Sequence, residues 1–369
     1  MKILVTGAGG FIGKNLTAQL SLISGIEILR HGRKSTHDDL LSALREADWV
    51  CHLAGVNRPE DDAEFKRVNT DFTHTLCDLV QASGRAIPII FASSVHVKKD
   101  NAYGRSKLAA EEILLEYSEE TGVPVHIFRL PHVIGKWCRP NYNSVIATFC
   151  YNIARDLPIR VDDPNYQLNL VYIDDLVDAF YAIMSSGSDY PGSYREVTPN
   201  YPITVGELAD QIRAFKDSRT SLISEPVGVG RTRVLNATYL SYLPIEALTV
   251  PLVQHADERG VFVEMLKTHD SGQFSFFTAH PGVTRGGHYH HSKSEKFLVI
   301  KGNAQFRFQH ILTNEQYEIF TSGDEPMIVE TIPGWAHDIT NVGENELIVM
   351  LWANEIFDPD CPDTYSFPL

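Results

Sequence analysis

A glycine-rich turn close to the amino terminus is the feature that most constrains the fold. The sequence Thr6-Gly7-Ala8-Gly9-Gly10-Phe11-Ile12-Gly13 follows an apolar run at residues 2–6 and leads into a helical pattern. Glycines between a strand and a helix let the backbone approach a pyrophosphate and direct the N–H groups of the helix towards it. Such glycines also serve tight turns without a ligand, but here the flanking strand and helix favour a dinucleotide site. The residues expected to contact the dinucleotide are Gly7, Gly10, Phe11, Ile12 and Gly13.

The hydrophobic pattern divides the chain into two parts. Up to about residue 180, short apolar runs alternate with amphipathic helical stretches, which indicates a parallel sheet with helices on both faces. From about residue 261, short strands separated by turn signals such as Pro281-Gly282 and Gly286-Gly287 indicate an all-β sandwich or barrel. We therefore predict an α/β Rossmann-like domain over residues 1–245 and an all-β domain over residues 252–369, joined near Leu243–Pro251. The first five strands are expected at residues 2–6, 26–30, 49–54, 87–93 and 123–130.

Composition narrows the functional classes. Asp and Glu number 47 against 32 Lys and Arg, and the net charge of −15 disfavours nucleic acid and anionic membrane surfaces as partners. The sequence contains neither an apolar run of the roughly 18 residues that span a membrane nor the apolar region of a signal peptide. The 5 cysteines are odd in number and form no Cys-x-x-Cys pair, so we expect reduced thiols in a cytoplasmic protein.

The residues after the second expected strand indicate which dinucleotide binds. An acidic residue there would hold the ribose 2′-hydroxyl of NAD, but this chain carries Arg30-His31-Gly32-Arg33-Lys34. Cations at this position suit the 2′-phosphate of NADPH. The same pattern is also compatible with a run of charged surface residues that bind only water. We predict NADPH as the cofactor, with Arg33 as the first phosphate-binding residue and Arg30 and Lys34 as the next.

A tyrosine and a lysine begin another expected helix, about ten residues after Ser93-Ser94, in the sequence Tyr103-Gly104-Arg105-Ser106-Lys107. Tyr103 and Lys107 share one helix face, so the ammonium can lower the pKa of the phenol. A phenol tuned in this way can donate or accept a proton when a hydride moves to or from carbon. The pair alone is compatible with an ordinary helix surface. Its distance from the glycine turn makes catalysis the stronger interpretation.

Residues 1–240 resemble the sugar-nucleotide branch of the extended short-chain dehydrogenase/reductase (SDR) family. Besides the glycine turn and the Tyr-x-x-x-Lys pair, the motifs that carry the resemblance are His52-Leu53-Ala54-Gly55, Val68-Asn69-Thr70, Ser93-Ser94, Arg129-Leu130-Pro131, Ile134-Gly135 and Val171–Leu176. The resemblance implies that Ser94, Tyr103 and Lys107 form the catalytic set and that the chain after Pro131 builds the sugar-nucleotide pocket. The further cofactor contacts that it implies are Leu53, Ala54, Tyr103 and Lys107.

The second part of the chain carries a pattern of metal ligands. His288 and His290 are two residues apart, so on a β-strand they point the same way, and Glu295 follows within reach. His337 comes later, on an expected antiparallel strand. Three imidazoles and one carboxylate suit Zn²⁺, Fe²⁺, Mn²⁺ or Ni²⁺, and we take zinc as the first choice. Histidine pairs on exposed strands also occur without a metal.

The spacing of these residues resembles the two motifs of the cupin superfamily, a double-stranded β-barrel, from about residue 255 onward. A second resemblance overlaps the first, because Asp257–Phe262 and Arg285–Tyr289 are similar to segments of dTDP-4-dehydrorhamnose 3,5-epimerases. In those enzymes the histidine after Arg-Gly-x is the catalytic base. His288 therefore has two competing roles, metal ligand and base, and both stay open.

A 4-keto sugar nucleotide explains both parts of the chain. The ketone acidifies the adjacent C–H bonds, so epimerisation can precede reduction by a hydride. The whole-chain arrangement resembles bifunctional capsular polysaccharide enzymes. This resemblance implies that the cupin epimerises UDP-2-acetamido-2,6-dideoxy-β-L-arabino-hex-4-ulose at C3 and that the SDR domain reduces C4 with NADPH. The product would be UDP-2-acetamido-2,6-dideoxy-L-talose, a precursor of N-acetyl-L-fucosamine. Because cupins often pair through their β-strands, the cupin resemblance also implies a homodimer.

Two other functions are compatible with parts of the sequence. The first is a sugar-nucleotide epimerase or dehydratase that retains NAD, with the cupin as a structural dimerisation domain, but the basic cluster at residues 30–34 speaks against bound NAD. The second is a nucleotide-sensing regulator with a sugar-binding cupin. The presence of Ser94, Tyr103 and Lys107 speaks against a protein without catalysis.

Overall fold

The computed structural model describes residues 1–186, 194–257, 260–263, 266–268, 272–355 and 360–369. Contacts between Cα atoms group the chain into two compact units. Unit 1 comprises residues 1–144 and 168–202, and unit 2 comprises residues 145–167 and 203–369. The domain boundaries expected at residues 245 and 252 follow the sequence pattern rather than these contacts, and they stay a prediction.

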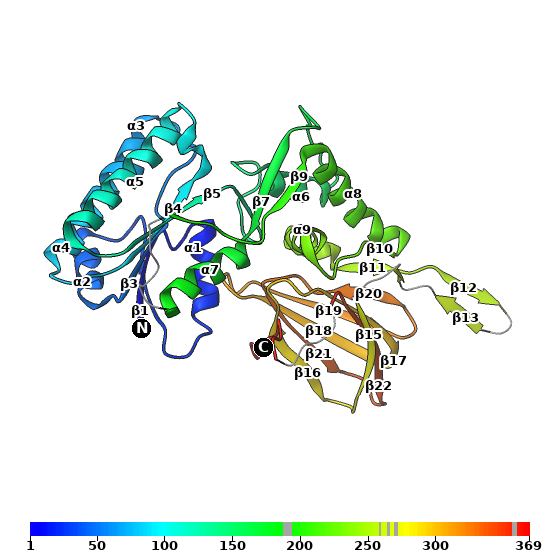
Figure 1. Cartoon of the computed structure of the whole chain (residues 1–369). Helices are drawn as coiled ribbons and strands as arrows, with labels where there is room; N and C mark the ends of the chain where they lie inside the picture. Colours follow the sequence, from blue (N-terminus) through cyan, green and yellow to red (C-terminus); the bar gives the residue numbers. More distant parts are fainter. Residues whose placement is uncertain (187–193, 258–259, 264–265, 269–271, 356–359) are drawn as a thin grey trace. The chain divides into compact units, whose positions relative to one another are not determined.

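Unit 1 is built on a parallel sheet of six strands in the order β2-β1-β3-β4-β5-β8 (Figure 1). The chain leaves β1 to one side for β2 and returns to the other side for β3, so the strand order reverses between β1 and β3. Open α/β sheets bind ligands at the carboxyl ends of the strands that flank such a reversal. The strands are β1 (Lys2–Thr6), β2 (Glu27–His31), β3 (Trp49–His52), β4 (Ile89–Ser94), β5 (Val125–Leu130) and β8 (Tyr194–Arg195).

Helices cover both faces of this sheet, with α2, α4 and α5 on one face and α1 and α7 on the other (Figure 1). Leu44, Leu76 and Leu114 from the first group pack on Val50 and Ile89 of the sheet in a fully buried core. The predicted α/β Rossmann-like fold is confirmed, and the five expected strands are present with their ends shifted by at most two residues. The helices of unit 1 are α1 (Phe11–Leu20), α2 (His37–Glu46), α3 (Ala63–Phe65), η1 (Lys66–Asp71), α4 (Phe72–Ala82), η2 (Val95–Lys98), α5 (Ala102–Thr121) and α7 (Ile173–Ser186). A second, small sheet contains β6 (His132–Ile134), β7 (Gln167–Tyr172) and β9 (Tyr201–Thr204).

Helix α5 has clear local start and stop signals. The side chain of Asn101 accepts a 2.8 Å hydrogen bond from the N–H of Gly104, which caps the first turn. The helix ends at Gly122, which has a φ of 69° in the left-handed region that glycine adopts without steric cost. These signals place Tyr103 and Lys107 in the first two turns of α5.

Unit 2 contains three longer helices, α6 (Val145–Ile153), α8 (Val205–Ser221) and α9 (Gly230–Leu240), followed by the short helix η3 (Ile245–Leu248). The stretch in which we predict the linker, near residues 243–251, forms regular structure of its own. Leu248 is fully buried in the core of the barrel, and β11 (Thr249–Pro251) pairs with β20 in one of its sheets. Burial of Leu248 and main-chain pairing of β11 fix this stretch.

The rest of unit 2 is a cupin-like barrel made of two five-stranded antiparallel sheets (Figure 1). The sheets have the strand orders β11-β20-β17-β22-β15 and β19-β18-β21-β16-β23. Their inner faces share a core that includes Phe297, Phe306, Phe308 and Val349. The predicted all-β class is confirmed, while Glu258 and Arg259 of the epimerase-like segment lie outside the described residues. The remaining strands are β10 (Ile223–Ser224), β12 (Gln254–Asp257), β13 (Gly260–Val263), β14 (Lys267–Thr268), β15 (Gln273–Ala279), β16 (Thr284–Tyr289), β17 (Glu295–Lys301), β18 (Asn303–His310), β19 (Gln316–Ser322), β20 (Met327–Glu330), β21 (Trp335–Asn341), β22 (Leu347–Ala353) and β23 (Tyr365–Ser366).

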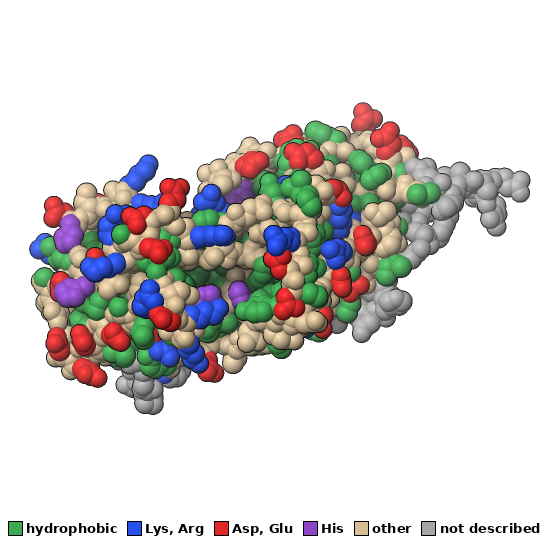
Figure 2. All heavy atoms as spheres, turned by 90° about the horizontal axis from the view of Figure 1, so that it is seen from above, with side chains coloured by type: hydrophobic (Ala, Val, Ile, Leu, Met, Phe, Trp, Pro, Cys, Tyr) green, Lys and Arg blue, Asp and Glu red, His purple; other side chains and the backbone are tan. Residues whose placement is uncertain are grey.

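Basic and acidic side chains are interspersed on the face shown in Figure 2. All five cysteines are free thiols. Within the described residues, every helix is too short or too polar to cross a membrane.

Candidate active site and metal centre

The glycine turn packs too closely to accept side chains at two positions. Gly7 has a φ of +68°, and a Cβ atom there would lie 2.7 Å from the backbone nitrogen of Ala54. A Cβ atom on Gly13 would lie 2.4 Å from the carbonyl oxygen of Gly7. A Cβ atom on Gly9, by contrast, would meet no other atom within 4 Å, so the outer side of the turn admits a ligand. This cradle at the start of α1 fits the pyrophosphate of a dinucleotide.

Thr6 ties the loop after β3 to the glycine turn. Its Oγ1 atom accepts 3.2 Å hydrogen bonds from the N–H groups of both Leu53 and Ala54. The imidazole of His52 lies between two threonine hydroxyls, at 2.8 and 2.9 Å, and burial lowers its pKa to about 3, so it is neutral. Leu53 and Ala54, both expected at the cofactor, therefore lie beside the glycine turn where the strand order reverses.

The three basic residues expected at the 2′-phosphate follow the same edge of the sheet. Arg30 is the last residue but one of strand β2, and Arg33 and Lys34 lie in a turn just beyond the strand. All three side chains are exposed, and within the described part of the chain none of them has an ion pair. Their charges are therefore available to an anion at the end of β2, as the prediction of NADPH requires.

Ser94, Tyr103 and Lys107 come together at the carboxyl end of β4. Ser94 is the last residue of that strand, and its side chain lies close enough to the Tyr103 phenol to influence the pKa of that phenol. One helical turn further along α5, the Nζ atom of Lys107 donates a 2.9 Å hydrogen bond to the carbonyl oxygen of Ala92 and lies 4.6 Å from the centre of the Phe91 ring. The three residues predicted as the catalytic set therefore lie near one another, and their catalytic role stays a prediction.

The pKa values at this set are governed by burial. Burial raises the pKa of the Tyr103 phenol, and the side chain of Ser94 opposes that rise. The expected lowering by Lys107 is therefore not the dominant effect. Burial also lowers the pKa of Lys107 to about 8, against the opposing charge of Glu111.

Asn69 supports this site, although the sequence motif around it suggested no role. Its Oδ1 atom accepts a 2.8 Å hydrogen bond from the N–H of Val56, and its Nδ2 atom donates to the carbonyl oxygen of Val56 at 3.0 Å and to Oγ of Ser106 at 3.0 Å. These bonds attach the loop after β3 to helix α5. A Cβ atom on Gly55 in that loop would lie 3.4 Å from Nζ of Lys107, so the glycine permits this close approach.

A hollow of about 540 Å³, within the size range of small-molecule pockets, is lined in part by Val95, the residue that follows Ser94. Its wall includes the segment after β5 that the SDR resemblance assigns to the sugar nucleotide. Three of its side chains, Lys98, Arg129 and Arg195, are basic, which suits a diphosphate. Arg129 is anchored by the buried carboxylate of Glu111, at 2.6 Å from Nη2.

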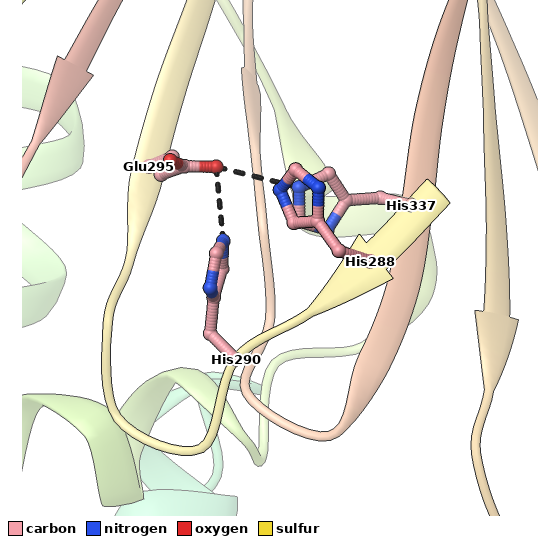
Figure 3. Close-up of side chains that lie close together, drawn as sticks. All are labelled: His288, His290, Glu295 and His337. Carbon is pink, nitrogen blue, oxygen red and sulfur yellow. Dashed lines mark hydrogen bonds and ion pairs between the residues drawn. The ribbon is translucent and has the colours of Figure 1, made fainter. Parts of the chain in front are cut away.

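The four predicted metal ligands converge inside the barrel (Figure 3). One ligand atom from each of His288, His290, Glu295 and His337 lies within 4.8 Å of the others. The Oε2 atom of Glu295 is 3.1 Å from Nε2 of His290 and 3.3 Å from Nε2 of His337. His288 and His337 face each other across paired strands, with ring centres 4.8 Å apart.

A β-bulge directs His288 towards this cluster. The pairing of β16 with β21 shifts register between Gly286 and His288, and both Gly286 and Gly287 have a positive φ, of 100° and 73°. A Cβ atom on Gly286 would lie 2.9 Å from the carbonyl oxygen of His337, so only glycine fits. The prediction of a turn at Gly286-Gly287 was wrong, because the two glycines form a bulge within a strand.

Charge and burial at the cluster fit a divalent cation. His337 is buried, with its Nε2 atom directed at the carboxylate of Glu295. Burial opposes ionisation of Glu295, but the contacts with His290 and His337 hold its pKa well below the usual value. Lys293, which sequence reasoning missed, forms an ion pair with Glu295, in which its Nζ atom lies 2.9 Å from Oε1 of the carboxylate. A buried carboxylate surrounded by imidazoles is a donor set suited to zinc.

His288 also lines a hollow of about 180 Å³ in the barrel. Its wall is formed by aromatic rings, including Phe277, Phe297 and Phe306, and by Arg285. A small molecule in this hollow would contact His288 and Glu295 directly. The position is compatible with both roles of His288, ligand and base.

Comparison with known proteins agrees with both halves of this geometry. Residues 3–194 match the model of the NAD dependent epimerase/dehydratase family. The chain belongs to this family. Residues 255–365 match the polysaccharide biosynthesis C-terminal domain. Membership in the NAD dependent epimerase/dehydratase family implies a nicotinamide cofactor, for which the glycine cradle is suited.

Individual relatives cover the whole chain. The UDP-2-acetamido-2,6-beta-L-arabino-hexul-4-ose reductase of Pseudomonas aeruginosa is 56% identical and covers 99% of this chain and 98% of its own. The crystal structure of the capsular polysaccharide assembling protein CapF from Staphylococcus aureus is 41% identical, with a TM-score of 0.69 and full coverage of both chains. UDP-glucuronic acid 4-epimerase from Bacillus cereus, 20% identical over 59% of this chain and 84% of its own with a TM-score of 0.54, shares the fold alone. The resemblance of the whole chain to capsular polysaccharide enzymes is thereby confirmed.

Proposed function

We propose that this member of the NAD dependent epimerase/dehydratase family is a bifunctional sugar-nucleotide enzyme. The barrel epimerises C3 of UDP-2-acetamido-2,6-dideoxy-β-L-arabino-hex-4-ulose. Unit 1 then reduces the C4 ketone with NADPH to UDP-2-acetamido-2,6-dideoxy-L-talose, a precursor of N-acetyl-L-fucosamine in capsular polysaccharide. The observation that carries the proposal is that Ser94, Tyr103 and Lys107 come together at the carboxyl end of β4. The reductase from Pseudomonas aeruginosa supports the substrate.

The reductive step needs a hydride at C4 and a proton at its oxygen. Bound NADPH supplies the hydride. Tyr103 gives its phenolic proton to the oxygen, and Ser94 holds that oxygen by a hydrogen bond. Lys107 stabilises the phenolate that Tyr103 becomes, because an ammonium on the same helix face favours the negative charge. The ketone becomes a secondary alcohol, and the phenolate recovers its proton from solvent.

Epimerisation at C3 must precede this reduction, because the C4 carbonyl makes the C3 proton acidic. A divalent cation at the His/Glu cluster, with zinc as the first choice, would act as a Lewis acid on that carbonyl. His290, Glu295 and His337 would hold the cation. His288 would complete the ligand set or remove the C3 proton, and its place in both the cluster and the hollow supports either role. We further propose that the enzyme is a cytoplasmic homodimer, as the cupin resemblance implies.

The proposal is tested with the purified protein and the UDP-linked 4-keto sugar. We expect NADPH to be consumed faster than NADH and the product to have the L-talo configuration by NMR. Interconversion of sugar nucleotides without net oxidation of added NADPH would instead indicate an enzyme that retains NAD, and would refute the proposal.

A further inference from the structure

A segment more than seventy residues beyond His288 lies alongside the strand that carries this histidine. Strand β23 pairs antiparallel with β16, with Ser366 opposite His288 and Tyr365 opposite Tyr289. The N–H of Phe367 donates a 2.7 Å hydrogen bond to the carbonyl oxygen of Gly287. The bulge that directs His288 is therefore held from its outer side by residues 365–367.

The carboxylate of Asp363, just before this strand, binds the loop between His290 and Glu295. It accepts hydrogen bonds from the N–H groups of His291 at 2.8 Å, Ser292 at 2.7 Å and Lys293 at 2.6 Å. The hydroxyl of Ser292 adds a fourth bond, at 2.9 Å. Three successive backbone N–H groups that surround one carboxylate fix the path of this loop.

Asp363 also orients the ring of His290. Its carbonyl oxygen lies 2.5 Å from Nδ1 of His290, and because a carbonyl only accepts, Nδ1 carries the proton. The lone pair of Nε2 then points to the other side of the ring, where Oε2 of Glu295 lies 3.1 Å away. A hydrogen bond on one imidazole nitrogen commonly selects the tautomer that ligates a metal through the other.

We infer that Asp363 is a positioning residue for the metal centre. Its carboxylate fixes the loop that follows His290, and its carbonyl oxygen fixes the ring of His290. The inference rests on the metal site of the proposed function and extends it to a residue outside the ligand set. Because the carboxylate, among the described residues, forms its hydrogen bonds with the loop at 291–293, replacing it should change the metal site while the ligands themselves remain.

The test compares zinc affinity in the full-length protein with Asp363→Asn, which keeps the side-chain size but replaces an acceptor oxygen by an NH₂ group facing N–H donors. Asp324→Asn is the matched control, because Asp324 is an exposed carboxylate on the barrel. Zinc affinity is measured by competition with a chromophoric chelator, and ligand geometry by the visible absorption of the Co²⁺-substituted protein. We expect zinc affinity to fall about 10–100-fold in Asp363→Asn, with an altered Co²⁺ spectrum, and to stay at the wild-type value in Asp324→Asn.

A merely structural role would lower the unfolding temperature of the variant but leave the zinc affinity and the Co²⁺ spectrum of the folded protein at wild-type values. That result would overturn the inference. If Asp363→Asn fails to fold, Asp363→Glu, which keeps the charge but displaces it by one CH₂ group, replaces it. Weaker zinc binding by Asp363→Glu supports the inference, and wild-type binding overturns it. If the wild-type protein binds neither zinc nor Co²⁺, the metal site of the proposed function is refuted. This outcome is distinct from failure of the Asp363 inference, because it is measured without any variant.

Discussion

The Nζ atom of Lys107 donates a 2.9 Å hydrogen bond to the carbonyl oxygen of Ala92, at the carboxyl end of the parallel sheet. This bond holds the ammonium inside unit 1, where its side chain is almost fully buried. Burial disfavours the charged form and lowers the pKa of Lys107 to about 8. The residue that supports Tyr103 thus changes its charge close to neutral pH.

The pH dependence of ketone reduction should report this charge. Lys107 is protonated below its pKa of about 8 and neutral above it, so kcat/KM for the ketone should fall as the pH rises past this value. Lys107→Arg keeps its proton over this whole range and should move the falling limb to higher pH. The pH profiles of kcat/KM for the two proteins are compared after each is normalised to its maximum. A falling limb at the same pH in both proteins would show that another group controls it.

Replacing Tyr103 by Phe removes only the hydroxyl group that we assign as the proton donor. Ketone reduction should fall by about 10²–10⁴-fold, the usual contribution of general acid catalysis. The affinity for NADPH, measured by fluorescence titration, should stay close to the wild-type value because the ring remains in place. Near-normal reduction by the variant would exclude Tyr103 from this role.

Arg33→Ala tests the choice of cofactor. If Arg33 binds the 2′-phosphate, KM for NADPH should rise by roughly tenfold or more, the cost of a lost charged hydrogen bond, while KM for NADH changes little. Arg33 is exposed and has no ion pair with any residue that the structure describes, so its removal should not affect folding. Arg45→Ala, which removes an exposed positive charge from α2, is the control. A wild-type enzyme that prefers NADH would contradict the assignment.

His288→Ala decides between the two roles of this histidine. If His288 is a metal ligand, the variant should lose zinc, as His290→Ala should. If His288 is the base, the variant should lose deuterium exchange at C3 while zinc remains bound. Zinc content by mass spectrometry and exchange by NMR give the two readouts. Circular dichroism is needed first, because metal loss can unfold a barrel. Full zinc content and full exchange in the folded variant would remove His288 from both roles.

Sequence reasoning succeeded where the signal is local. The strand at residues 2–6, the glycine turn and the first turn of α5 each depend on residues a few positions apart, so the periodicity and the glycine spacing reveal them. His288 and His290 were predicted together for the same reason, since neighbouring residues of a strand alternate between faces. His337 required the cupin resemblance, because no local pattern relates it to the pair.

The features that were missed depend on contacts between distant segments. Asp363 meets the loop at residues 291–293 only because β23 pairs with β16, and nothing near Asp363 in the sequence indicates this pairing. Gly286-Gly287 has the composition of a turn, and only the pairing with β21 makes it a bulge. Leu248 was assigned to a linker because its burial depends on strands that follow it in the sequence.

The central claim is that the barrel epimerises C3 and unit 1 reduces C4, and the most direct test separates the two steps in deuterium oxide. Tyr103→Phe with NADPH should exchange the C3 proton of the UDP-4-keto sugar at the wild-type rate while oxidising almost no NADPH. Glu295→Gln should exchange little at C3, yet reduce the C3-epimerised ketone at a rate close to that of the wild type. Loss of C3 exchange in folded Tyr103→Phe, or full exchange in folded, metal-free Glu295→Gln, would contradict the account.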